Sequence, residues 1–409
     1  MEYKLSDICS GITDGSHNPP AGISNSDYLM LSSKNIFDDE ITFDAPRYLS
    51  EEQFVVENKR TRIKPGDILM TIVGTVGRTA IVPDGISTIT LQRSVAVLHP
   101  LKDICFSRYL MYALRSKRKF FESEAHGVAQ KGIYLKQLSN IIVDVPELER
   151  QEATVQILDF VQNIIKKRHE ELDKLDELIK ARFIELFGTY PANEKRWTAG
   201  TIRDLVTEVR YGSSRKAADG DSGKYPYLRM NNITYNGELD LTDTKTIDIP
   251  DEELEKCTVR RGDLLFNRTN SKELVGKTCV YNRDEMMVLA GFVVRVRLND
   301  RALPEFVSAF MNTDFSKQML LGMCKAAIGQ ANINAQELQN IGIYIPPLQV
   351  QKDFVSFKTQ VDKSKYQAEP NSRKYHIHRL RKQYQELTDS LFLYFTKLFE
   401  VIIFQKGIC

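Results

Sequence analysis

The sequence predicts an α+β protein in which two pseudo-symmetric, β-rich domains are separated by two long antiparallel α-helical arms that form a coiled coil. Three observations lead to this prediction. The second half of the 409-residue chain repeats the first at a spacing near 200 residues. Short β-rich runs bounded by turn residues fill most of each repeat. Each repeat then ends in a stretch whose apolar residues recur at alternating steps of three and four, the heptad pattern of paired helices.

The composition is that of an ordinary globular protein. The chain is 42% hydrophobic and 27% charged with a net charge of +2, so any nucleic-acid surface must be local. The six cysteines are scattered without a Cys-x-x-Cys pair, which indicates neither a zinc site nor a disulfide framework and fits a reducing cytoplasm. The sequence shows no signal-peptide pattern and no apolar run of spanning length. We therefore expect a cytoplasmic protein with no membrane partner.

Matching motifs make the repeat visible. The segment Gly66-Asp67-Ile68-Leu69 is matched by Gly262-Asp263-Leu264-Leu265, and both are expected to be structural turns that enter a strand. From Phe106 onward the spacing is a constant 200 residues. The matched pairs there include Ile133 with Ile333, Leu138 with Leu338, Asn140 with Asn340, Pro146 with Pro346, and Gln151 with Gln351. So many matches in one register indicate an internal duplication.

The duplication divides the chain into four parts. Residues 1–148 and 191–348 form the two β-rich domains, residues 149–190 the central helical arm, and residues 349–409 the C-terminal helical arm. The matched motifs fall inside the two domains, except that Gln151 and Gln351 lie, with the heptad stretches, inside the two arms.

The central arm is predicted to be one helix from Glu152 to Gly188, roughly 55 Å long at 1.5 Å per residue. A Gly followed by Pro191 is a typical stop for such a helix. Two arginines, Arg168 and Arg182, interrupt the apolar seam, and Glu171 and Glu185 are the acidic neighbours that could accept them. The expected packing residues of the seam are Ile165, Leu172, Leu175, Ile179 and Leu186.

The C-terminal arm repeats this seam with twelve additional residues before it. The extra residues lie around Pro370, and since proline is hostile to a helix interior we expect a break near residues 368–371. The expected packing residues of this arm are Ile377, Leu380, Leu387, Leu391 and Leu398.

The ordered, duplicated set of motifs resembles the specificity (S) subunits of Type I restriction–modification systems over essentially the whole chain. Further marks of the resemblance are the run from Gly74 to Arg78 and the helix end from Arg182 to Gly188. The resemblance implies two target recognition domains that each read one half of a split, asymmetric double-stranded DNA sequence. It also implies helices that fix the gap and dock two methyltransferase (modification) subunits, to which restriction/translocase subunits are added.

Basic residues are the candidates for DNA contact, since phosphates need cations and base edges need Arg, Lys, Asn or Gln. A cluster of charges can also be a solvated face, and that alternative stays open for each residue. The candidates are Arg78, Arg93, Arg115, Lys117, Arg118 and Lys131 in the first domain, and Arg215, Lys216, Arg229, Arg268 and Lys277 in the second.

The sequence carries no catalytic or metal-binding pattern, and we expect no cofactor. Asn18-Pro19-Pro20 is followed by Ala21 in place of the aromatic residue that amino-methyltransferases use. The histidines show no metal-ligand spacing. The prediction is therefore a non-catalytic recognition subunit. Two alternatives stay open, a coiled-coil scaffold for protein interactions and the specificity part of a single-chain restriction–methylation enzyme.

Overall fold

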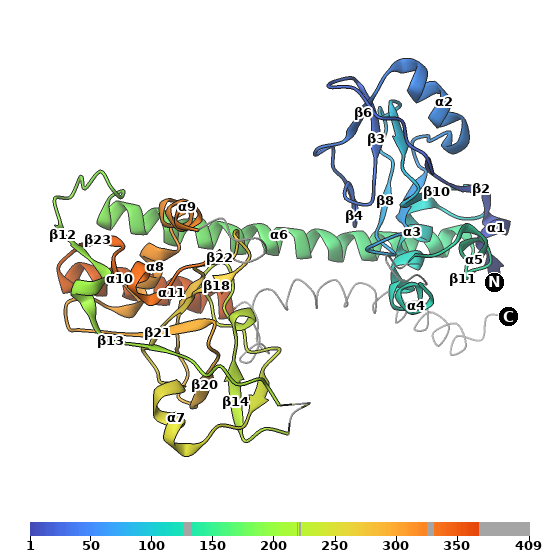
Figure 1. The fold of residues 1–409 in the computed structure, drawn as a ribbon. Coiled ribbons are helices and arrows are strands. Elements are labelled where there is room, and N and C mark those ends of the chain that lie inside the picture. The colour runs from blue at the N-terminus through green and yellow to red at the C-terminus, as the bar shows by residue number, and fades with distance from the viewer. Residues whose placement is uncertain (126–131, 219, 221, 325–330, 368–409) are drawn as a thin grey trace. The chain divides into compact units, whose positions relative to one another are not determined.

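The computed structural model of the chain describes residues 1–125, 132–218, 220, 222–324 and 331–367 (Figure 1). The chain divides into two compact units that meet inside the long helix α6 (Leu148–Phe187), between Lys167 and Arg168. In the part of the chain that the structure describes, no helix is both long enough and apolar enough to cross a membrane.

The first unit is built on a four-stranded antiparallel sheet and a three-stranded sheet. The four-stranded sheet has the order β2 (Cys9–Asp14), β10 (Val95–Pro100), β7 (Ile68–Thr71), β8 (Thr79–Ile81). The three-stranded sheet has the order β6 (Arg47–Leu49), β3 (Tyr28–Leu31), β9 (Ile89–Leu91). The remaining elements are β1 (Glu2–Lys4) paired with β11 (Ile142–Asp144), β4 (Ile36–Phe37) paired with β5 (Glu40–Ile41), α1 (Leu5–Ile8), α2 (Glu51–Thr61), α3 (Ser107–Ser116), α4 (Arg118–Glu124) and α5 (Leu135–Ser139).

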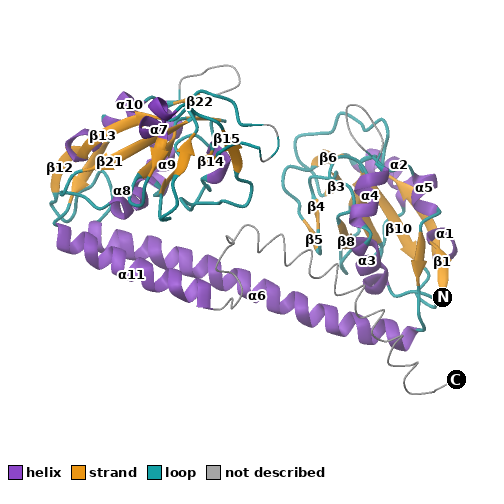
Figure 2. Ribbon diagram, turned by 90° about the horizontal axis from the view of Figure 1, so that it is seen from below, coloured by secondary structure: helices purple, strands orange, loops and turns teal. Residues whose placement is uncertain are grey.

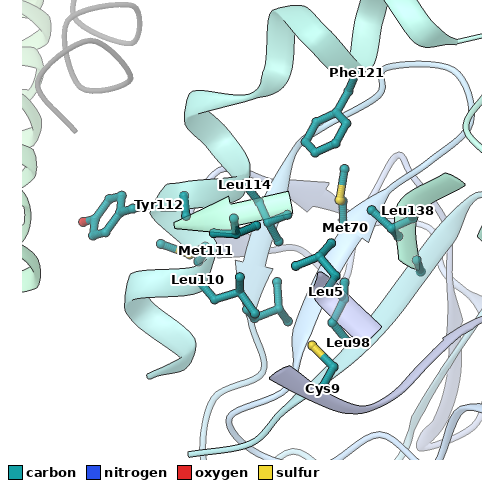
Figure 3. Packing of buried hydrophobic residues seen from close by; sticks show 14 of the residues in the cluster. Leu5, Cys9, Met70, Leu98, Leu110, Met111, Tyr112, Leu114, Phe121 and Leu138 are labelled. Atoms are coloured by element: carbon teal, nitrogen blue, oxygen red, sulfur yellow. The ribbon is translucent and has the colours of Figure 1, made fainter. Parts of the chain in front are cut away.

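The core of the first unit lies between α3 and the four-stranded sheet (Figure 3). Apolar residues of α3 fall at helical spacing, so that Leu110, Met111 and Leu114 are all buried. They share one cluster with Met70 and Leu98 of the sheet. The α6 residue Leu158 belongs to the same cluster and is fully buried, so the start of the long helix is part of this domain's core.

The second unit repeats the same arrangement, as the internal duplication predicts. Its main sheet has the order β13 (Val206–Tyr211), β21 (Val293–Leu298), β17 (Leu264–Asn267), β19 (Thr278–Val280). A second sheet has the order β15 (Lys245–Ile247), β14 (Tyr225–Leu228), β20 (Met287–Leu289), β16 (Thr258–Val259). The other elements are β12 (Thr198–Thr201) paired with β23 (Gly342–Ile345), β18 (Thr269–Asn270) paired with β22 (Ala331–Asn332), the 3-10 turns η1 (Ile202–Leu205) and η2 (Met230–Asn232), and helices α7 (Asp251–Cys257), α8 (Pro304–Met311), α9 (Asp314–Met323), α10 (Ala335–Gln339) and α11 (Leu348–Gln367).

A glycine directly after the first strand of each main sheet lies where a side chain would have no room. A Cβ on Gly15 would lie 2.0 Å from the Leu91 carbonyl oxygen, and one on Gly212 would lie 2.2 Å from the Leu289 carbonyl oxygen. Both glycines follow the first strand of a main sheet and let the chain pass against the neighbouring strand β9 or β20.

The predicted central helix is present and begins earlier than expected, at Leu148 in place of Glu152. It ends at Phe187, and Gly188 follows with a positive φ of 79°. The two arginines that interrupt its seam pair with the predicted acidic neighbours. Arg168 lies 2.5 Å from Glu171, and Arg182 lies 2.7 Å from Glu185.

Helix α11 packs antiparallel against the C-terminal half of α6 within the second unit (Figure 2). The Arg168 guanidinium donates to the Lys365 carbonyl at 3.1 Å, while the Phe183 and Phe354 ring centroids lie 5.3 Å apart near the opposite end of the pair. Of the predicted seam, Leu172 is buried, whereas Ile165, Leu175, Ile179 and Leu186 are half-buried. The predicted seam of the C-terminal arm, Ile377, Leu380, Leu387, Leu391 and Leu398, and the break near 368–371 lie outside the described residues.

Candidate nucleic-acid interface

The strand register brings several loops to one end of the main sheet in the first unit. Asp14 pairs with Ala96, Val95 pairs with Thr71, and Thr79 pairs with Met70, so these four strands all turn at the same end. The parallel pair β3 and β9 runs toward that end as well, because Leu31 pairs with Leu91. We call the connecting segments 15–18, 32–35, 72–78 and 92–94 the loop end of the first unit.

Backbone hydrogen bonds join these segments into one surface. The Arg93 N–H donates to the Ser16 carbonyl at 3.0 Å, and the Ile72 N–H donates to the Ser94 carbonyl at 2.9 Å. The Ser33 N–H donates to the Ser94 hydroxyl at 3.0 Å. Side chains on these segments therefore have fixed positions relative to one another, as a reading surface requires.

The second unit has the same loop end, formed by segments 212–216, 229–232, 268–277 and 290–292. The Gly291 N–H donates to the Ser213 carbonyl at 2.7 Å, which matches the bond from Arg93 to Ser16. The Arg268 N–H donates to the Phe292 carbonyl at 3.0 Å and ties two of the segments together.

In the first unit, Arg78 and Arg93 lie at the loop end. Arg93 is exposed and takes part in no ion pair within the described residues. The Arg78 guanidinium lies over the Phe37 ring, 4.9 Å from its centroid. Arg118 reaches the loop end from α4, where it donates to the Gly77 carbonyl at 3.3 Å, and pairs with Asp38 at 2.6 Å. Lys117 is half-buried between α3 and α4, and Lys131 lies outside the described residues.

Arg115 requires a correction, because it is a core residue. Its side chain is 1% exposed. The guanidinium pairs with Asp39 at 2.6 Å and donates to the Thr79 hydroxyl at 3.0 Å and the Thr79 carbonyl at 2.8 Å. It lies one turn after Met111, on the face of α3 that covers β8, so helical spacing was the signal that could have placed it inside. A buried, fully paired guanidinium is not available to DNA.

In the second unit, Lys216 is exposed at the loop end and takes part in no ion pair among the described residues. Arg268 is half-buried, and its guanidinium lies 4.9 Å from the centroid of the Tyr211 ring. Two other candidates are held by carboxylates, Arg215 by Glu253 at 2.7 Å and Arg229 by Asp243 at 2.9 Å.

Lys277 also requires a correction, because it is buried and donates to the Met230 carbonyl at 2.8 Å. Burial lowers the pKa of its ammonium group. A second lysine, Lys317, donates to the Tyr235 carbonyl at 3.1 Å and lies 4.5 Å from the centroid of that ring. Burial, together with the charges of Lys277 and Lys180, lowers the pKa of Lys317 to about 8. Lys277 and Lys317 therefore hold the segment after β14 and are not free cations.

Two exposed aromatic residues lie at the second loop end, and neither was among the predicted DNA contacts. Phe292 is 52% exposed and Tyr211 is 43% exposed. The first unit has Ser94 where the second has Phe292, because each residue directly precedes the matched strand β10 or β21. The two loop ends thus share a backbone frame but present different side chains.

The structure agrees with the expected structural role of the Gly-Asp motifs. Asp67 accepts from the Lys64 N–H at 2.6 Å, and Asp263 accepts from the Arg260 N–H at 2.8 Å, which closes the turn before β7 and before β17. Among the described residues, no group of three or more His, Cys, Asp or Glu side chains is arranged to hold a metal ion.

Comparison with known proteins agrees with this architecture. The family model for the Type I restriction modification DNA specificity domain matches twice, at residues 3–175 and 194–374. The Type I restriction enzyme EcoKI specificity subunit of Escherichia coli is 22% identical over 276 residues, which cover 63% of this chain and 59% of that protein. The MjaVIII specificity subunit of Methanocaldococcus jannaschii is 23% identical over 328 residues, which cover 75% of each chain.

A solved structure shows the same fold. The S subunit of a Type I restriction–modification system from M. genitalium superposes with a TM-score of 0.50 at 13% identity, and the match covers 96% of this chain and 94% of that one. The two family matches coincide with the two structural repeats, and together they take in most of the sequence. The chain therefore belongs to the family of Type I restriction–modification specificity subunits, whose domain serves DNA target recognition.

Proposed function

We propose that this chain reads a bipartite, asymmetric double-stranded DNA target and directs methyltransferase and restriction/translocase subunits to it. Each domain, residues 1–148 and 191–348, reads one half of the target with its loop end. The observation that carries the proposal is the duplicated loop end, in which the same backbone frame presents different side chains in the two units. Two domains that share a fold but expose different side chains are suited to recognising two different half-sites.

The proposed contacts are the basic and aromatic side chains that the loop ends expose. Arg93 and Lys216 take part in no ion pair among the described residues, so their charges can contact phosphate or a base edge. An arginine can donate two hydrogen bonds to guanine. In the second unit, Phe292 and the stacked pair of Tyr211 and Arg268 suit apolar contact with a thymine methyl group or a base step. Of the other predicted contacts, Arg78, Lys117, Arg118, Lys131, Arg215 and Arg229 stay candidates.

The helical arms are proposed to fix the separation of the two half-sites. Helix α6 is 40 residues long, or about 60 Å, and pairs with α11 in the second unit. We propose that the arms, residues 149–190 and 349–409, form the coiled coil and dock two modification subunits. The partner subunits, and not this chain, would then carry out the reactions that use S-adenosylmethionine and ATP. Purified alone, the chain should neither methylate nor cut DNA, and its expected cytoplasmic location stays a prediction.

A salt titration of DNA binding tests this function. The observed affinity of the chain with its modification subunits should fall steeply and linearly with salt on a double-logarithmic plot. Replacing a phosphate-contacting residue, as in Arg93→Ala or Lys216→Ala, should reduce the slope by about 0.9 each. Lys102→Ala, at an exposed position after the opposite end of β10, serves as the matched control and should leave the slope unchanged. Binding that ignores both salt and sequence would contradict the proposal.

A further inference from the structure

A buried glutamine occupies the first turn of each arm helix in the structure. Gln151 of α6 and Gln351 of α11 are both 0% exposed. The Gln151 Oε1 accepts from the Phe106 N–H at 2.9 Å, and its Nε2 donates to the carbonyls of Ile104 at 2.8 Å and Pro146 at 2.7 Å. The amide is thereby bonded on both its oxygen and its nitrogen.

The second copy repeats these bonds one for one. The Gln351 Oε1 accepts from the Leu303 N–H at 2.8 Å, and its Nε2 donates to the carbonyls of Arg301 at 3.0 Å and Pro346 at 2.8 Å. The same geometry in two copies, each in its own unit, marks these bonds as a built feature of the repeat. The sequence match of the two glutamines did not by itself indicate this role.

Each glutamine joins three pieces of backbone at one point. Ile104 and Phe106 belong to the segment that enters α3, Pro146 follows β11, and Gln151 itself belongs to the arm helix. Because buried backbone groups are destabilising when they lose their hydrogen-bond partners, the bonds hold the helix start at one angle to its domain. A tilt of about 10° at this point would move a surface roughly 20 Å away by about 3.4 Å, the rise of one base pair.

The contacts that support the glutamine differ between the units. In the first unit, Asp159 lies two turns further along α6 and accepts from Arg108 at 2.8 Å and from the Tyr112 hydroxyl at 2.6 Å. In the second unit, Phe306 of α8 packs against two rings of α6, 5.9 Å from Phe183 and 4.7 Å from Phe187 between ring centroids. Phe354 of α11 belongs to the same buried cluster. The second domain is thus held to its arm by a larger apolar contact.

We infer that Gln151 and Gln351 are positioning residues, which fix the angle between each recognition domain and its arm helix and so set the gap between the half-sites. This inference rests on the proposed function. The base sequence that each loop end recognises does not depend on Gln151 or Gln351. The number of base pairs between the two half-sites depends on both glutamines. Since aromatic packing also holds the second domain, the first domain should be the more sensitive to loss of its glutamine.

The test is the methylated motif of the full chain expressed with its modification subunits. Gln151→Met and Gln351→Met keep most of the side-chain volume and remove all three bonds. We expect both half-sequences to stay unchanged while sites with a gap altered by one base pair rise at least tenfold above their wild-type level, more for Gln151 than for Gln351. The exposed Gln156→Met on α6 and Gln349→Met on α11 are the controls and should keep the wild-type gap.

Methylation confined to the original gap, at full or reduced level, would overturn the inference, since a purely structural role lowers the amount of methylation without moving the gap. If Gln151→Met lowers the folded fraction, Gln351→Met decides by the same two gap outcomes, since aromatic packing also holds the second unit. A wild-type complex that methylates no split target would instead count against the proposed function, so the two failures are distinguishable.

Discussion

At the scale of single residues, two arginines predicted to contact DNA have opposite environments. Arg115 is buried and paired with Asp39, whereas Arg93 is exposed with no ion pair among the described residues. Residue type does not distinguish them, and helical spacing indicates only that Arg115 shares the face of Met111 on its helix. The tertiary contacts of α3 with β8 determine that Arg115 is buried, and these contacts join residues far apart in the chain.

The two arginines should therefore respond differently to mutation. Arg115→Met should lower the free energy of unfolding by about 3 kcal/mol, since it removes the partner of the buried Thr79 carbonyl and of the half-buried carboxylates of Asp38 and Asp39. Arg93→Ala should change it by less than about 0.5 kcal/mol and weaken DNA binding. Chemical denaturation and DNA titration measure the two effects separately. Equal loss of stability in both variants would contradict this assignment.

Lys317 should make the stability of the second unit depend on pH. Its pKa of about 8 in the folded chain lies below the ordinary lysine value, so between these values the unfolded chain binds more protons. The free energy of unfolding should therefore rise with pH from about 8 to 10.5, and below pH 8 the penalty for the buried charge is constant.

The expected gain across that window is about 1 to 3 kcal/mol, and it should be missing in Lys317→Met. Thermal melts of both proteins across the window measure the difference and cancel the titration of other groups. Lys272→Met, at an exposed position of the same unit, is the control. Identical pH profiles for wild type and Lys317→Met would show that folding does not lower the pKa of Lys317.

At the scale of elements, the heptad pattern predicted the long helix and its arginine interruptions but missed two of its buried aromatic positions. Phe183 and Phe187 are 6% and 5% exposed, and their rings pack with Phe306 and Phe354. They lie outside the predicted seam because they face the core of the second domain and not only the partner helix. A heptad reading assumes one partner surface, and this part of α6 has two.

The aromatic cluster should therefore contribute more stability than the exposed face of the same helix. Phe187→Ala should lower the free energy of unfolding by about 3 to 5 kcal/mol, because it removes a buried ring from a packed cluster. Ile184→Ala, at a position 50% exposed on the same helix, should cost less than about 1 kcal/mol. Denaturant unfolding compares the two. A larger loss from Ile184→Ala would mean that the exposed face of α6, and not the cluster, holds the unit.

At the scale of the whole molecule, the sequence was sufficient for the duplication, the α+β class and the central helix. Several of the matches that revealed the duplication are buried residues, and Gln151 and Gln351 make the same bonds in both copies. The reading surfaces could not be predicted in the same way. Arg93 and Phe292 occupy corresponding turns with unrelated side chains, and their neighbours come from loops distant in sequence.

Those unlike turns predict that variants of the two domains affect different halves of the target. Arg93→Ala should relax or weaken one half-site only, and Phe292→Ala the other, with about 1 to 3 kcal/mol lost at the position that each residue contacts. Binding competition with single-base variants of the target checks this for each variant. Loss of specificity in both halves from one variant would mean that the loop ends do not read independently.

The most direct test of the account is the methylome of cells that carry this chain with its modification subunits and no other methyltransferase. Two differently built loop ends on one duplicated frame predict a single methylated motif made of two unlike half-sequences with a fixed gap between them. A continuous motif, or two identical half-sequences in inverted order, would contradict it.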